Sequence, residues 1–267
     1  GAPVGKAPKS RPYPVSADDR KFWAFHSPAR PAIPKIVNRT SEIANPIDAF
    51  ILRKLKAKRL SLSPAANKQT LIRRATFDLL GLPPEPAAVE EFAKAAAADL
   101  DGAYSALLDR LLASDHYGER WARHWLDIVR FAESNGYAFD GDRPNAWHFR
   151  DFVINALNSD MPYDEFVRLQ IAGDLLADTN SKTDDQADSA VRNLAATGFL
   201  VAGPYTTQQT QKERERSRYE QLDDIVSTIG TSLLGLTVGC ARCHSHKFDP
   251  LPQHDYYRFI SNFADVG

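Results

Sequence analysis

The segment Cys240-Ala-Arg-Cys243-His244 holds both cysteines of the chain and one of its seven histidines. Two thiols at this spacing lie on one short turn, so they can form thioether bonds to the two vinyl groups of a haem. The histidine that follows can bind the iron as an axial ligand. The spacing therefore predicts one covalently attached haem c on Cys240 and Cys243, with His244 as the proximal iron ligand.

Three other interpretations of these residues stay open. A structural zinc site could use both cysteines with His244 or His246, but closed tetrahedral sites usually take two ligand pairs from separated segments, and the sequence offers no second pair with that spacing. A redox-active dithiol belongs at the start of a helix in a βαβ unit, and no strand pattern precedes Cys240. Two ordinary buried cysteines would not require the adjoining histidine. Haem attachment is favoured over all three.

Two neighbours of the motif are predicted as further cofactor-binding residues. Arg242 lies between the two cysteines, within reach of a haem attached there. His246 follows the proximal ligand so closely that the chain would have to wrap around the porphyrin edge to reach the opposite face of the iron. A hydrogen bond to a haem propionate suits His246 better.

The second axial ligand is predicted to be His124, in the segment Trp121-Ala-Arg-His-Trp-Leu-Asp-Ile128. It shares a helical face with Trp121, Trp125 and Ile128, which predicts an apolar and aromatic environment. A core histidine that bonds to a backbone carbonyl or to Asp127 is the alternative. The residues alone leave these two interpretations level.

A loop with several oxygen ligands, Asp140-Gly-Asp142-Arg-Pro-Asn145, is a second candidate metal site. Asp140 and Asp142 could bind calcium through their carboxylates. The loop lacks the full ligand spacing of a known calcium loop, so a capped turn is the favoured interpretation.

Helices must position these residues. Apolar side chains recur at spacings of three and four along most of the chain, and no run alternates with a period of two for long enough to form a sheet. The predicted helices cover residues 46–55, 71–80, 87–98, 104–112, 117–133, 145–158, 163–176, 187–200, 219–236 and 254–264. The polar stretches 178–188 and 205–218 are predicted as loops or solvated helix faces. The expected fold is all-α: one multi-helical domain over residues 20–267 that encloses the haem, after a linker or extended arm over residues 1–19.

Composition excludes several classes of partner. The chain has 267 residues, 43% of them hydrophobic, and its 33 basic and 34 acidic residues leave a net charge of -1. This balance offers no long-range attraction for nucleic acid. The longest weakly polar stretch, residues 227–241, is shorter than the ~20 apolar residues that a membrane span needs. Thioether bonds to haem are made outside the cytoplasm, so a periplasmic or otherwise exported protein is expected. The N-terminus lacks the pattern of a secretory signal, so the signal is expected to be missing from this chain.

The motif and its surroundings also resemble a known family. The run Cys240-Ala-Arg-Cys-His-Ser-His-Lys-Phe-Asp-Pro250, followed by Asp255-Tyr-Tyr-Arg258, closely resembles the end of the planctomycete-type cytochrome c domain family, long catalogued as a domain of unknown function. The resemblance extends almost end to end, through motifs that include Trp23-Ala-Phe, Asn45-Pro-Ile-Asp-Ala-Phe-Ile-Leu52, Phe77-Asp-Leu-Leu-Gly-Leu-Pro-Pro84, Tyr117-Gly-Glu-Arg-Trp-Ala-Arg-His-Trp-Leu-Asp127 and Ala172-Gly-Asp174. It implies an exported, multi-domain protein, with residues 1–19 as an interdomain linker and with neighbouring domains or a redox protein as partners.

The family pattern has histidine at the positions of His124, His244 and His246, so the resemblance favours His124 as the distal ligand. The chain departs from the pattern at Ser245, where an acidic residue is common. This puts any shared role of that carboxylate in doubt and leaves the attachment chemistry untouched.

The distal ligand decides between the functions that a haem would allow. With two histidine ligands the iron can pass electrons, and electron transfer is the leading hypothesis. With only His244 bound, the open position would allow a peroxidase-like or substrate-oxidising enzyme whose distal pocket is lined by Arg123, His124, Asp127 or Arg130. An interaction module with a structural haem or zinc site is the third hypothesis. A domain of ~100–150 residues would suffice to bury one haem, so the additional helices need a separate explanation.

Overall fold

A computed structural model describes residues 15–35, 45–137, 140–176, 184–207 and 209–266 of the chain. Regular structure in these residues is helical, and the β pairing among them is limited to an isolated bridge between Ser134 and Asp142. The predicted all-α class is therefore confirmed for the described residues. None of their helices is long and apolar enough to cross a bilayer.

The N-terminal helices are α1 (Pro46–Ala57), α2 (Lys68–Leu80), α3 (Pro86–Ala98) and α4 (Leu100–Leu112). Three of them begin after a residue whose side chain accepts a hydrogen bond from a backbone N–H of the first turn, namely Asn45, Asn67 and Asp99. Such caps satisfy N–H groups that have no partner within the helix. Helix α2 ends at Gly81, whose φ of 76° is a left-handed conformation that glycine adopts without strain.

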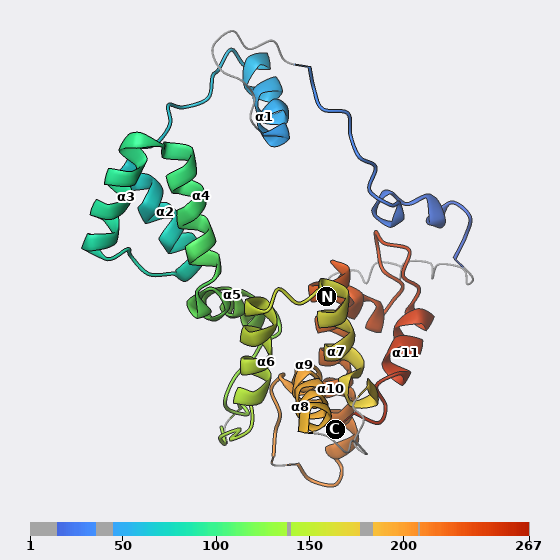
Figure 1. Cartoon of the computed structure of the whole chain (residues 1–267). Helices are drawn as coiled ribbons and strands as arrows, with labels where there is room; N and C mark the ends of the chain where they lie inside the picture. The colour runs from blue at the N-terminus through green and yellow to red at the C-terminus, as the bar shows by residue number, and fades with distance from the viewer. Residues whose placement is uncertain (1–14, 36–44, 138–139, 177–183, 208, 267) are drawn as a thin grey trace, which may run out of the picture.

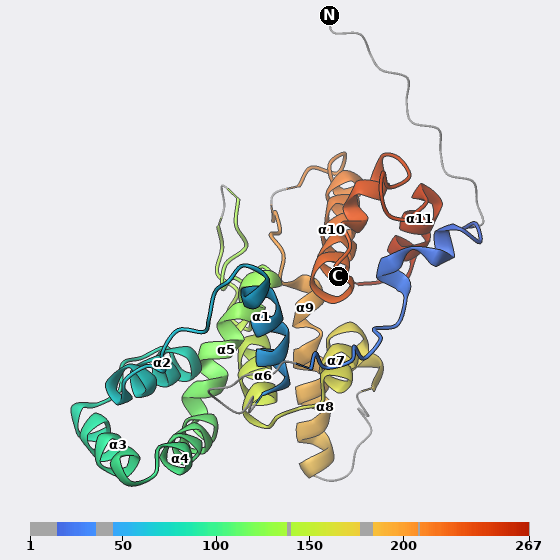
Figure 2. The same ribbon diagram turned by 90° about the horizontal axis from the view of Figure 1, so that it is seen from above.

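The remaining elements are α5 (Asp115–Ile128), α6 (Trp147–Asn158), α7 (Tyr163–Leu176), α8 (Asp184–Ala196), α9 (Gly198–Val201), α10 (Arg214–Ile229), the π-helical turn η3 (Gly230–Leu234), the 3-10 helix η4 (Val238–Arg242) and α11 (Gln253–Ser261). Figures 1 and 2 show α2–α4 on one side of α5, with α6–α11 on the other. Helix α5 contacts α2 as well as α6, so it joins the two groups.

The hydrophobic core divides into two clusters. The smaller cluster lies between α2, α3 and α4 and includes Ile72, Phe92 and Leu107. The larger cluster is built by α5–α11, with Val153 and Val226 fully enclosed. Because each cluster buries apolar side chains of several helices, each supplies its own hydrophobic stabilisation.

Several predicted helices have different bounds in the structure, and two of them show a physical reason. The helix predicted over residues 187–200 breaks at Thr197 into α8 and α9. A Cβ at the next residue, Gly198, would lie 2.6 Å from the Cβ of Phe149, so this close approach of α9 to α6 requires glycine. The helix predicted over residues 117–133 ends at Ile128, and Arg130 has a left-handed φ of 55°.

Part of each polar stretch is helical, which is one of the two predicted alternatives. Helix α10 begins at Arg214, within the stretch 205–218, and α8 begins at Asp184, within the stretch 178–188. Residues 177–183 lie outside the described residues, as do residues 1–14 of the predicted arm. The described residues that follow the arm form two short 3-10 helices, η1 (Asp19–Lys21) and η2 (Trp23–Phe25), and Trp23 is 80% exposed.

Candidate functional site

The two cysteines lie on one exposed face of the 3-10 helix η4 and of the residue that follows it. Such a helix has three residues per turn, so side chains three positions apart point the same way. Cys240 and Cys243 are both exposed free thiols, whereas Val238 and Ala241 are buried against the core. The close packing of η4 on α10 requires glycine before the first cysteine, because a Cβ at Gly239 would lie 2.5 Å from the hydroxyl oxygen of Ser227. The local sequence therefore leaves both thiols exposed at the surface.

A cavity of about 620 Å³ opens beside these thiols; we call it the motif cavity. Its lining residues come from η4 and the loop after it: Thr237, Gly239, Cys240, Cys243, His244, His246, Lys247, Phe248 and Asp249. Its volume lies within the ~300–1,000 Å³ that is common for cofactor and small-molecule sites. The cavity thus brings together the three residues that the sequence predicts to attach and ligate a haem.

The ring of His244 is held in a single tautomer. Its Nδ1 lies 2.9 Å from the backbone carbonyl oxygen of Ser245. A carbonyl oxygen can only accept, so Nδ1 carries the proton and Nε2 keeps its lone pair. Histidines that bind a metal usually donate their other ring N–H in this way, because the bond orients the ring and raises the basicity of the ligand nitrogen. The Nε2 atom of His244 is therefore the ring nitrogen that keeps a lone pair, and its ligation of iron stays a prediction.

His246 stabilises the loop after η4. The residue is 7% exposed, and its Nδ1 accepts hydrogen bonds from the backbone N–H groups of Phe248 and Asp249, at 3.3 and 2.8 Å. Its Nε2 must then carry the proton and donates a hydrogen bond to the Thr237 hydroxyl oxygen at 2.9 Å. Both ring nitrogens bond to protein groups, and the contact of His246 with a haem propionate stays a prediction.

Arg242 is also turned away from the motif cavity. Its guanidinium donates to the Asp223 carboxylate on α10 at 2.9 Å, and this charge raises the pKa of Arg242 above its usual value. The same carboxylate accepts a short hydrogen bond from the hydroxyl of Tyr256 on α11. Burial first, and then the bond to Asp223, raises the pKa of Tyr256 well above 10.0. These contacts connect the cysteine segment to α10 and α11, and the haem contact of Arg242 stays a prediction.

His124 does not lie in the apolar environment that its neighbours predicted. It is exposed on α5, with its ring centroid 5.4 Å from that of Trp121, and Trp121 and Ile128 are themselves 40% and 55% exposed. Helix α5 packs on α6 through another face, where a Cβ at Gly118 would lie 2.5 Å from the carbonyl oxygen of Ile154. The structure does not bring His124 to the motif cavity, and its ligation of iron stays a prediction.

The other predicted site residues are also separate from the motif cavity. Arg130 pairs with Asp224 of α10 at 2.7 Å, and Arg123 lies 4.0 Å from Asp127 along the exposed face of α5. Asp140 accepts from the backbone N–H of Gly136 at 2.6 Å, as in a capped turn. Within the described residues, no group of three or more His, Cys, Asp or Glu side chains could hold a metal ion.

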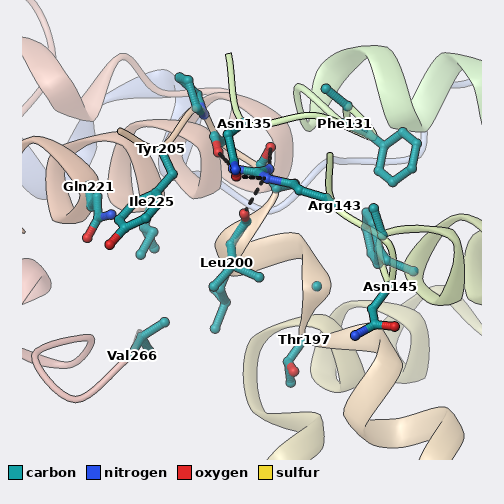
Figure 3. Close-up of a pocket in the computed structure, with 18 of the residues that line it drawn as sticks. Phe131, Asn135, Arg143, Asn145, Thr197, Leu200, Tyr205, Gln221, Ile225 and Val266 are labelled. Carbon is teal, nitrogen blue, oxygen red and sulfur yellow. Dashed lines mark hydrogen bonds between the residues drawn. The ribbon is translucent and has the colours of Figure 1, made fainter. Parts of the chain in front are cut away.

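The structure also contains a larger cavity of about 1170 Å³, which we call the arginine cavity and which the sequence did not predict (Figure 3). Its wall combines α6, α8, α9 and α10 with the loops around Arg143, Tyr205 and Val266. Arg143 donates to the side-chain oxygen of Asn135 and to the backbone carbonyl oxygens of Val201, Ala202 and Gly203, at 2.6–3.3 Å. No local pattern marks this site, because its residues come from segments far apart in the sequence.

Comparison with known proteins places the chain in a family but supplies no activity. A family model described as PSCyt2, protein of unknown function (DUF1549), matches residues 46–267. No curated protein and no solved structure matches the chain.

This match corrects the resemblance to a cytochrome c domain family. The matching family is uncharacterised and its description assigns no cofactor, while the structure shows Cys240 and Cys243 as free thiols with no haem-binding group evident around them. The identification as a cytochrome family therefore does not stand. The motif Trp23-Ala-Phe also lies outside the matched residues. The match covers most of the sequence, and the chain belongs to the PSCyt2 family of proteins of unknown function (DUF1549).

Proposed function

We propose that this domain binds one haem c covalently through Cys240 and Cys243, with His244 as an axial ligand, and serves in electron transfer. The observation that carries the proposal is the His244 ring, whose Nδ1 bond to the Ser245 carbonyl leaves Nε2 as the ligand nitrogen. The proposal rests on the motif and on this geometry, since the family has no assigned activity.

Several properties of the motif cavity support this proposal. Both thiols are exposed free cysteines, so each is accessible for a thioether bond. Thr237 and Phe248 contribute a hydroxyl and an aromatic ring to the same wall. When bound, the haem supplies a one-electron redox couple whose potential depends on its axial ligands and on its burial.

The position of the thiols favours electron transfer. Phe248 at the rim of the motif cavity is 68% exposed, so this wall is open to a partner from outside. A redox protein, or a neighbouring domain of a longer chain, would approach at this surface. Export to the periplasm belongs to the same proposal, because the thioether bonds are made outside the cytoplasm.

Expression with cytochrome c maturation machinery in an exporting host tests the proposal. We expect the mass of the chain to increase by that of one haem, and Cys240→Ala and Cys243→Ala to remove covalent attachment. His244→Ala should change the spin state in optical and EPR spectra. His26→Ala, at an exposed histidine outside the motif cavity, is the matched control and should change nothing. A fully matured chain without covalent haem would refute the proposal.

The same spectra show whether His124 is the second axial ligand of the iron. If His124 is the distal ligand, the wild type is six-coordinate and low-spin and His124→Ala is high-spin. A high-spin wild type would favour a haem enzyme with an open position over an electron carrier.

A further inference from the structure

The arginine cavity shares no lining residue with the motif cavity, so any ligand that it binds is separate from the proposed haem. Its apolar surface comes from Phe131, Leu200, Ile225 and Val266, which Figure 3 shows around the open space, and from further apolar residues of α8 and α9. Large cavities with an apolar lining and a few polar groups are the usual form of small-molecule sites. The cavity therefore suits a ligand with an apolar body.

Part of the polar wall is already engaged and rigid. Arg143 holds three successive carbonyl oxygens, and its burial, together with the nearby charge of Arg130, lowers its pKa. Arg130 in turn forms an ion pair with Asp224 that packs directly on Gly203, where a Cβ would lie 2.0 Å from a carboxylate oxygen of Asp224. These contacts shape the cavity wall without a ligand, so little ordering would be needed on binding.

Other polar groups of the wall are available to a ligand. Gln221 is half-buried on α10 and faces the cavity beside Tyr205 in Figure 3, and no hydrogen bond of its amide is present among the described residues. Arg214, about two turns earlier on the same helix, is exposed and has no ion-pair partner in the described part of the chain. The Nη2 atom of Arg218 donates hydrogen bonds to the carbonyl oxygens of Phe263 and Ala264, and its other N–H groups remain for a ligand.

The charge of the lining is positive once the paired groups are set aside. Three arginines that line the cavity, Arg143, Arg214 and Arg218, have no carboxylate within ion-pair distance among the described residues. Asp142 and Asp265 are the unpaired acids of the lining, and both are exposed at its edge. Three positive charges against two negative charges favour an anionic ligand over a neutral or cationic one.

We propose that the arginine cavity binds a small organic anion with an apolar, ring-sized body, whose charged group lies against Arg214 and the amide of Gln221. The apolar body fills the space between Leu200, Ile225 and Val266. Gln221 supplies amide donors to the anion, and Arg214 supplies the charge that distinguishes it from a neutral molecule of the same shape.

Isothermal titration calorimetry with two matched probes tests this inference. Naphthalenesulfonate carries the anionic group, and naphthalenemethanol has the same rings without a charge. We expect the wild type to bind one naphthalenesulfonate and to bind it more tightly than naphthalenemethanol. Arg214→Gln should weaken the sulfonate about fivefold, since the charge is partly exposed, and leave the alcohol unchanged.

Two further variants locate the site. Arg216→Gln removes the same charge from the same helix at a position outside the cavity, where Arg216 pairs with Glu220, and should leave both probes unaffected. Val201→Trp places a large side chain into the cavity from a position that is 55% exposed, and should abolish binding of both probes. Binding that persists in Val201→Trp, or the absence of saturable binding by the wild type, overturns the site. Equal effects of Arg214→Gln on the two probes overturn its preference for anions.

Discussion

Substitution of Asp223 gives the sharpest test of how the cysteine segment is held. This carboxylate on α10 accepts from the Arg242 guanidinium at 2.9 Å and from the Tyr256 hydroxyl, and so connects η4 with α10 and α11. Asp223→Ala removes both contacts. Asp223→Asn removes the charge but keeps a side-chain oxygen that can still accept from Tyr256.

The two substitutions should differ in magnitude. The Arg242 and Asp223 side chains are 42% and 25% exposed, so water screens their ion pair, and its loss should cost below about 1 kcal/mol. Tyr256 is 2% exposed, and a buried hydroxyl that loses its acceptor costs roughly 1–3 kcal/mol. We therefore expect Asp223→Ala to lower the free energy of unfolding by about 2–3 kcal/mol and Asp223→Asn by less than about 1 kcal/mol.

Urea denaturation followed by far-ultraviolet circular dichroism at neutral pH measures both values. The double variant Asp223→Ala, Tyr256→Phe provides the control, because removal of the orphaned hydroxyl should recover part of the loss. Equal destabilisation by Asp223→Ala and Asp223→Asn would refute the reasoning. It would mean that the ion pair, and not the buried hydroxyl, supplies the stability.

Three further predictions follow from other contacts. Gly173→Ala should lower the free energy of unfolding by roughly 1–3 kcal/mol, because its Cβ would lie 2.0 Å from the carbonyl oxygen of Asn193 where α7 meets α8; an unchanged urea midpoint would contradict this. His246→Ala should speed amide hydrogen exchange at Asp249, which loses its acceptor, and unchanged protection would show that the loop does not depend on the imidazole. The raised pKa of Tyr256 means that the folded chain keeps this proton at a pH where the unfolded chain has lost it. The contribution of Tyr256 to stability is therefore complete below about pH 10.0 and is lost as the pH rises further. In Tyr256→Phe the free energy of unfolding should fall less steeply with rising pH in this range, and an equally steep fall would argue against Tyr256 as its source.

Local sequence was sufficient to predict most of the helices. The range predicted for α7 agrees with the structure, and the predicted end of α2 at Leu80 is confirmed. Apolar spacing, side-chain caps and glycine act within a few residues of one another, so a single sequence carries them.

Only the tertiary structure decided what surrounds the predicted site residues. An apolar stripe does not show which helix, if any, will pack against it. The tryptophans near His124 therefore could not predict that the described helices leave this face of α5 exposed. Arg242 bonds to Asp223, nineteen residues earlier, and His246 bonds to Thr237. Packing of η4 on α10 and α11 brings the members of each pair together. The arginine cavity depends on contacts of this kind from five segments of the chain. Such contacts form only when the helices have closed on a common core, and no periodicity within one segment records them.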